Sequence, residues 1–169
     1  AKALVHAGFK VGIIDTDIHG PNVAKLLGCE DAMLTGTDGN INPVEPYEGL
    51  KVVSISFALE NPEDAIVFRG PLKLSVIQQL IGDVEWGKLD YLLIDTPPGT
   101  GDEQLAAAQN IPALAGCVIV TTPQDLSLLD SRRSISFARQ LKLDIIGVVE
   151  NMSGFVCPHC GQFVDIFGT

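Results

Sequence analysis

The sequence has few cationic side chains. It holds 11 lysines and arginines against 21 aspartates and glutamates, which gives a net charge of −10 at neutral pH. Binding to nucleic acid needs clusters of lysine and arginine that face phosphates, so this composition argues against a nucleic-acid partner. Any anionic ligand would have to be held by local features such as helix N-termini, backbone N–H groups or a metal ion.

The sequence also lacks a long apolar run, although 46% of its residues are hydrophobic. No stretch approaches the roughly 20 residues that a membrane-spanning helix needs, and no basic segment followed by an apolar one opens the sequence at Ala1. We therefore expect a soluble, cytoplasmic protein with no membrane partner. The 169 residues suffice for one domain with a substantial core, and they contain no internal repeat.

Apolar segments bounded by turn residues predict five strands, at 11–15, 50–57, 91–95, 116–122 and 145–151. Several are apolar at nearly every position, which is typical of strands covered on both faces in a parallel sheet. Helices are expected at 71–84, 103–111 and 123–142. The last should open with a capping box from Thr122 to Asp125, with Pro123 at its first position. The alternation predicts a single α/β domain over 1–169, with a mostly parallel, twisted sheet flanked by helices.

Aspartates end two of the predicted strands. Asp15 ends the segment VGIID, and Thr16 separates it from Asp17. Asp95 ends the segment YLLID, just before a Pro-Pro-Gly-Thr-Gly loop. Ligands of doubly wound sheets bind beyond the carboxyl ends of the strands, where carboxylates can hold Mg²⁺ or orient an attacking water. Four apolar residues followed by Asp95 form a Walker-B-like arrangement, and the glycines would let the loop respond to a γ-phosphate. The structural alternative is that these aspartates cap ordinary turns.

Two of the four cysteines form a unit, in the stretch FVCPHCGQF. Cys157 and Cys160 are spaced to share one metal ion or one edge of an iron–sulfur cluster. A tetrahedral site needs two further ligands, and His159 lies too close along the chain to be a good third one. A redox dithiol is the alternative. Cys29 and Cys117 are isolated and are interpreted as packing residues.

Five motifs occur along the chain in the order DTDIHGPN, FRGPLK, DYLLIDTPPGTGDEQL, VIVTTPQDLSLLD and GVVENMSGFVCPHCG. In this order they resemble the Mrp-type ATPases, which are iron–sulfur cluster carriers in the MinD/ParA group of P-loop NTPases. The resemblance covers the chain from about residue 8 onward. Arg69, in the second motif, is a candidate phosphate or partner contact, with a solvated or paired cation as the alternative.

The resemblance implies roles for individual residues in binding and hydrolysing ATP. Asp17 is expected to position the hydrolytic water, with Asp15 beside it near Mg²⁺. Asp95 corresponds to the Walker B aspartate, and Asn151 to the asparagine that hydrogen-bonds the adenine ring. Hydrolysis would be coupled to cluster transfer through the loops at 15–22 and 95–102.

For the cysteines, the resemblance implies a 4Fe–4S cluster bound at the interface of a homodimer. Cys157 and Cys160, in the loop at 152–163, would supply two thiolates, and a second copy would supply the other two. The cluster would be delivered to apo iron–sulfur proteins. Zn²⁺ could occupy the same four-sulfur cage in an aerobic preparation.

The chain departs from the family at its phosphate loop. The glycine- and lysine-rich loop is absent from these residues, and by the usual layout it would lie roughly a dozen residues before Ala1. We therefore expect the sequence to be part of a longer protein, incomplete at both ends. Two alternatives remain open: a MinD/ParA-like positioning ATPase with a structural zinc knuckle, and a non-catalytic metal-binding module without a phosphate loop.

Overall fold

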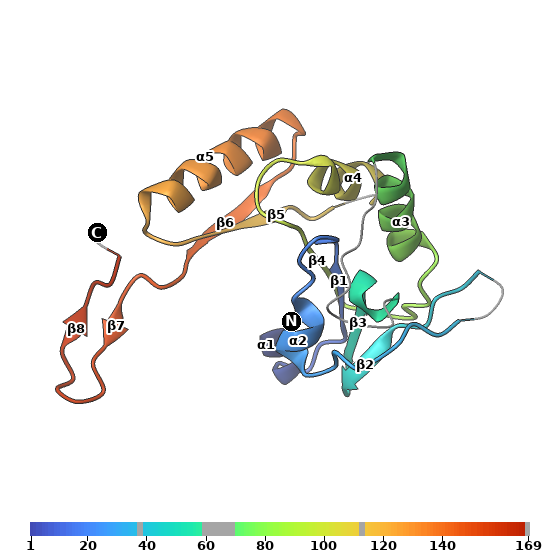
Figure 1. Ribbon diagram of the computed structural model, residues 1–169, viewed down its shortest axis with the longest axis horizontal. Helices are drawn as coiled ribbons and strands as arrows, with labels where there is room; N and C mark the ends of the chain where they lie inside the picture. Colours follow the sequence, from blue (N-terminus) through green and yellow to red (C-terminus); the bar gives the residue numbers. More distant parts are fainter. Residues whose placement is uncertain (37–38, 59–69, 112–113, 168–169) are drawn as a thin grey trace. The chain divides into compact units, whose positions relative to one another are not determined.

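The computed structural model describes residues 1–36, 39–58, 70–111 and 114–167 (Figure 1). Arg69 lies outside these described residues. Two compact units are formed, each described here by itself: Ala1–Pro97 with Asp102–Ile111, and Pro98–Gly101 with Pro112–Thr169. None of the helices in the described ranges is both long and apolar enough to cross a membrane.

The first unit is built on a four-stranded sheet with the order β2-β3-β1-β4. The central strand β1 (Val11–Asp15) pairs in parallel with β3 (Leu50–Ser54) on one side and β4 (Tyr91–Asp95) on the other. The register aligns the last residues of all three strands, since Asp15 lies opposite both Ser54 and Asp95. Three strands therefore end at one edge of the sheet, where parallel sheets bind ligands.

The core of this unit lies on both faces of β1, as its apolar sequence predicts. Val11 and Val52 pack with α2 (Val23–Leu27), and α1 (Lys2–His6) contributes Leu4 and Val5 to the same cluster. On the other face, Ile14 and Val53 pack with Leu80 of α3 (Gly70–Gly82), whose Ile77 meets Ala106 of α4 (Asp102–Asn110). Full burial of each such aliphatic side chain contributes about 1.5–3 kcal/mol.

Strand β2 (Val44–Tyr47) is not among the five strands predicted from the sequence. It pairs antiparallel with β3, with Val44 opposite Val52 and Tyr47 opposite Leu50. Pro46 is tolerated because β2 is an edge strand and because Pro46 lies where the register with β3 shifts, between Val44 and Tyr47.

Strand β3 is shorter than the predicted 50–57, because the chain turns at Ser54 into the 3₁₀ helix η1 (Ile55–Ala58). The Ser54 hydroxyl accepts a hydrogen bond from the Ser56 N–H at 3.2 Å. That local bond diverts the backbone from the strand ladder.

The second unit contains a parallel pair of strands, β5 (Cys117–Thr121) and β6 (Ile145–Glu150), joined by α5 (Asp125–Gln140). The five predicted strands all form, three in the first sheet and two in this pair. The predicted capping box is wrong in detail, because α5 begins two residues later with Gln124 as its N-cap. Ser127, in the first turn, accepts the Thr122 N–H at 3.0 Å and so takes the part that the capping box assigned to the Asp125 side chain.

A short hairpin follows β6 and ends the described chain (Figure 1). Strands β7 (Phe155–Val156) and β8 (Phe163–Val164) pair antiparallel, with Phe155 opposite Val164 and Val156 opposite Phe163. The C-x-x-C sequence forms the turn between them.

We predict that Gly12→Ala lowers the free energy of unfolding of the first unit by about 1–3 kcal/mol through overpacking. An added Cβ on β1 would lie 2.6 Å from Leu89 Cδ1, 2.8 Å from Leu92 Cδ1 and 2.9 Å from Trp86 Cζ3. Trp86 is the only tryptophan, so its fluorescence in a urea titration reports this unit directly.

Gly82→Ala is the matched control. It ends α3, and an added Cβ there would meet nothing within 4 Å. Its effect should be neutral or stabilising, by up to about 1 kcal/mol, because alanine favours helix. Equal effects of the two substitutions would contradict the packing described around Gly12.

Candidate functional site

The candidate site lies at the shared carboxyl edge of β1, β3 and β4. Thr16, directly after β1, connects the ends of β1 and β4, because its N–H and its hydroxyl both donate to the Asp95 carbonyl, at 2.9 and 2.8 Å. Asp15, Ser54 and Asp95 end the three strands in register. Two residues that are 80 positions apart in the sequence, Asp15 and Asp95, thus become neighbours.

Asp15 is a buried carboxylate, with 1% of its surface exposed. Its Oδ1 accepts the Asp17 N–H at 3.1 Å, and its Oδ2 accepts the Val23 N–H at 3.2 Å and the Ser54 hydroxyl at 3.3 Å. Burial raises the pKa of Asp15 from 3.8 to about 6, with a further contribution from the charge of Asp95, and these three hydrogen bonds oppose the rise.

Asp17 lies on the loop that follows β1 and is partly exposed. Its Oδ1 accepts the His19 N–H at 3.2 Å and the Gly20 N–H at 3.0 Å. Both aspartates therefore cap turns, which was the structural interpretation of this motif. The same bonds hold the loop in one shape beside the end of β4, so capping is compatible with a second role at the site.

Asp95 is the most open of the three carboxylates, and its side chain reaches solvent. The surrounding protein atoms raise its pKa by desolvation, and the charge of Asp17 raises it further. Mutually repelling carboxylates favour a cation, but no three His, Cys, Asp or Glu side chains in the described ranges are arranged to hold one metal ion. The donor set at this edge therefore fits Mg²⁺ only if the ion takes its other ligands from water or phosphate oxygens.

Asn151 directly follows β6 in the second unit. Its N–H donates to the Thr121 carbonyl at 2.8 Å, and its side-chain oxygen accepts the Met152 N–H at 2.9 Å. The side chain is exposed at the carboxyl end of the β5–β6 pair. It is thus placed at a strand end, as predicted, but in a different unit from the three aspartates.

The cysteine pair occupies the tight turn of the β7–β8 hairpin. The Cys157 N–H donates to the Gln162 carbonyl at 2.9 Å, and the Gly161 N–H donates to the Cys157 carbonyl at 2.8 Å. Gly161 has φ +71°, which favours glycine. The backbone N–H groups of Cys160 and His159 lower the pKa of the Cys157 thiol. The turn thus presents two thiols, with Cys160 exposed and Cys157 partly so.

The other two cysteines differ from this pair. Burial raises the pKa of both the Cys29 and the Cys117 thiols. The Cys29 thiol donates to the Ala24 carbonyl at 3.5 Å. Thiols with a raised pKa are poor metal ligands and poor nucleophiles at neutral pH, which agrees with their interpretation as packing residues.

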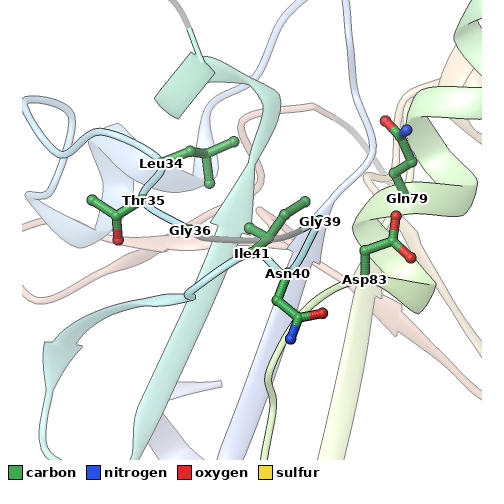
Figure 2. A pocket seen from close by; sticks show the side chains of 8 residues that line it. All are labelled: Leu34, Thr35, Gly36, Gly39, Asn40, Ile41, Gln79 and Asp83. Atoms are coloured by element: carbon green, nitrogen blue, oxygen red, sulfur yellow. The ribbon is translucent and has the colours of Figure 1, made fainter.

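A separate cavity of about 350 Å³ lies between the loop at 34–41 and the end of α3 (Figure 2). Its lining residues are Leu34, Thr35, Gly36, Gly39, Asn40, Ile41, Gln79 and Asp83. Figure 2 shows Asp83 and Gln79 on the helix side and the remaining residues on the loop side. The cavity includes none of the predicted site residues.

Sequence reasoning did not identify Ser54 or Thr16 as part of the site. Both are fully buried polar residues that hydrogen-bond to the strand-end aspartates. The available signal was the pair of serines in the SIS segment, which directly follows the apolar residues Val52 and Val53. That segment marks the point where β3 reaches the same edge as Asp15.

Comparison with known proteins gives a family-model match over residues 1–169, to the ParA model described as NUBPL iron-transfer P-loop NTPase. The chain is 51% identical over 168 residues to the iron-sulfur cluster carrier protein of Methanocaldococcus jannaschii, and 54% identical to that of Saccharolobus solfataricus. It is 44% identical to the human cytosolic Fe-S cluster assembly factor NUBP2. These matches cover 99% of this chain but 58%, 57% and 63% of the relatives, so the chain spans about three-fifths of their length.

Among solved structures, a nucleotide-binding protein of Archaeoglobus fulgidus in complex with ADP matches with a TM-score of 0.79 and 41% identity. The match covers 96% of this chain and 62% of that one. The MinD cell division protein of Aquifex aeolicus matches with a TM-score of 0.58 and 20% identity, over 88% of this chain and 58% of that one, which speaks for the fold alone. The predicted α/β fold class, a mostly parallel sheet flanked by helices, is confirmed.

We predict that Asp15 titrates near pH 6 in the folded protein, against 3.8 ordinarily. Because the folded state then binds the proton more strongly than the unfolded state, the free energy of unfolding should fall as pH rises from about 4 to about 6, by up to about 3 kcal/mol. ¹³C NMR of the Asp15 carboxyl measures the pKa. Urea unfolding across this range measures the slope, which should flatten in Asp15→Asn. A carboxyl that titrates below pH 5 would contradict the prediction.

Proposed function

Since the chain belongs to the ParA family of NUBPL iron-transfer P-loop NTPases, we propose that it is part of an ATP-dependent carrier of iron–sulfur clusters. The carrier binds a 4Fe–4S cluster and delivers it to apo iron–sulfur proteins. The observation that carries this proposal is the hairpin turn that presents Cys157 and Cys160 together, with a lowered pKa at Cys157. Relatives named as iron–sulfur carriers and assembly factors support it.

The cluster is proposed to sit between two copies of the chain. Two thiolates are half of the four that a cluster or a tetrahedral Zn²⁺ takes, and the described residues contain no further side chain placed to complete the set. A two-fold axis next to the hairpin brings a second pair. The hairpin's own surface suits such a contact, because Phe155, Val156, Phe163 and Val164 are between 46% and 64% exposed.

The proposed nucleotide is ATP with Mg²⁺, bound beyond the strand ends. Asp17 orients the attacking water, and Asp95 supports Mg²⁺ through its exposed carboxyl. Asp15 holds the loop that carries Asp17. Asn151 contacts the adenine. The ADP complex of the Archaeoglobus relative, at 41% identity, supports nucleotide binding. The chain spans about three-fifths of its relatives' length, and we propose that the phosphates are cradled by a glycine-rich loop outside residues 1–169.

Hydrolysis is proposed to change the hold on the cluster. The loop at 15–22 depends on hydrogen bonds to two aspartates, and the loop at 95–102 contains Gly99 with φ +100°. Loops of this kind are remade when a γ-phosphate arrives or leaves. We also propose that the protein acts in the cytosol, as the name of the human relative states for that protein.

We predict that the full-length protein, reconstituted anaerobically with iron and sulfide, is a dimer with one four-iron cluster. Native mass spectrometry should show this mass for the wild type, and the cluster should be lost in Cys157→Ser/Cys160→Ser. The matched control is Cys29→Ser/Cys117→Ser, which removes two thiols outside the hairpin and should keep the cluster.

A monomer, or a dimer that carries zinc and takes up no iron, would refute cluster carriage. Either result would favour a MinD/ParA-like positioning ATPase with a structural zinc knuckle.

We predict that Asp17→Asn lowers the ATPase kcat of the full-length protein by about 10²–10⁴-fold, the usual range for a group that positions or activates the attacking water. ATP binding, measured by calorimetry, should change little. Asp130→Asn on α5 is the control, because Asp130 carries an exposed ion pair with Arg133 at 3.1 Å and should leave kcat unchanged. An unaffected kcat in Asp17→Asn would remove this residue from the mechanism.

A further inference from the structure

Ser54 is a fully buried hydroxyl that the proposed nucleotide site does not account for. It ends β3, opposite Asp15 in the parallel register. Its oxygen accepts the Ser56 N–H at 3.2 Å and the Ser56 hydroxyl at 2.9 Å, and its own hydroxyl donates to Asp15 Oδ2 at 3.3 Å. A buried serine with this set of bonds has a defined orientation.

The hydrogen-bond capacity of Ser54 explains that orientation. A hydroxyl has one proton to donate and two lone pairs to accept with. Ser56 occupies both lone pairs, one through its N–H and one through its own hydroxyl. The remaining proton of Ser54 points to Asp15, so η1 sets the direction in which Ser54 donates.

Asp15 passes this constraint on to the loop. Its Oδ1 accepts the Asp17 N–H, and its Oδ2 accepts the Val23 N–H at the start of α2 together with the Ser54 hydroxyl. The carboxylate therefore fixes both ends of the segment 17–23, which carries Asp17. Since Asp15 is 1% exposed and both of its oxygens accept protein donors, it is better suited to holding this segment than to a direct bond with a ligand.

We propose that Ser54 is a positioning residue for the nucleotide site. Its hydroxyl, oriented by Ser56, fixes the Asp15 carboxylate, and Asp15 in turn fixes the backbone of Asp17 and the start of α2. The consequence for hydrolysis rests on the proposed function. The positioning of the loop does not, so the two are tested separately.

The first measurement is hydrogen exchange by mass spectrometry on the full-length protein. In Ser54→Ala, peptides that cover 15–23 should exchange about tenfold faster, since a hydrogen bond to a charged group is lost. Peptides from α4 should be unchanged. Ser54→Thr, which keeps the hydroxyl, should restore slow exchange. Ser131→Ala is the matched control, because its hydroxyl donates to the Ser127 carbonyl at 2.8 Å within α5.

The second measurement is ATP hydrolysis by the same variants. Ser54→Ala should lower kcat about tenfold, because the loop that carries Asp17 is displaced. The KM for ATP should stay within about twofold, because the groups that bind ATP are unchanged. Ser54→Thr should recover most of kcat. Should Ser54→Ala fail to fold, Ser56→Ala offers a milder change. It keeps the Ser54 hydroxyl and the backbone N–H that donates to it, removes only the donor hydroxyl of Ser56, and should act in the same direction with a smaller effect.

The outcomes separate the two proposals. Unchanged exchange at 15–23 in Ser54→Ala and Ser56→Ala would overturn the positioning role, whatever the ATPase activity. Faster exchange throughout the first unit would also overturn it, because it would make Ser54 a general packing residue. A wild-type protein that hydrolyses no ATP would refute the proposed function, while faster exchange confined to 15–23 in Ser54→Ala would still support the role of Ser54.

Discussion

The buried carboxylate of Asp15 is the interaction on which the first unit depends. It stands at the end of the central strand and accepts hydrogen bonds from three elements: β3 through Ser54, the following loop through Asp17, and α2 through Val23. A buried carboxylate is costly unless it is hydrogen-bonded. The three donors offset that cost, and they also determine where the loop and the helix begin.

Negative charge is concentrated at the same edge. The pKa of Asp15 is raised in part by Asp95, and that of Asp95 in part by Asp17, so the carboxylates repel one another. Such an arrangement is tolerated because β1 and β4 are held in register by their backbone hydrogen bonds. Binding of the proposed Mg²⁺ would relieve the repulsion and would thereby favour one arrangement of the surrounding loops.

The thiols of the cysteine pair, in contrast, are positioned by contacts between residues close together in the chain. Cys157 and Cys160 are held by a six-residue turn and a two-residue strand pair, and the bonds that shape the turn all lie within 157–162. The apolar side chains of the hairpin remain exposed. The cysteine turn can therefore form locally, whereas a complete cage for a cluster needs ligands from outside the hairpin. This separation would suit the proposed cluster, which the carrier would have to accept and release.

The local features could be predicted from the sequence alone. The five apolar strands, the helices α3, α4 and α5 and the cysteine turn depend on periodicity and on residues close together in the chain, whereas the short α2 was not predicted. The edge strand β2 was not predicted, because Pro46 is untypical of a strand and only the pairing with β3 shows that Pro46 lies at the sheet edge, where the register shifts. Likewise, the start of α5 depended on a hydrogen bond from Thr122 to Ser127 that no capping pattern indicates.

The sequence by itself determined which aspartates end strands and which cysteines share a turn, because both are matters of local order. Only the tertiary structure decided what those aspartates touch. Ser54 reaches Asp15 across 39 residues, and Thr16 reaches the Asp95 carbonyl across 79. Such contacts follow from strand register, which is set by how whole apolar faces pack rather than by any single residue. The burial that raises the pKa of Asp15 likewise exists only once those faces have met.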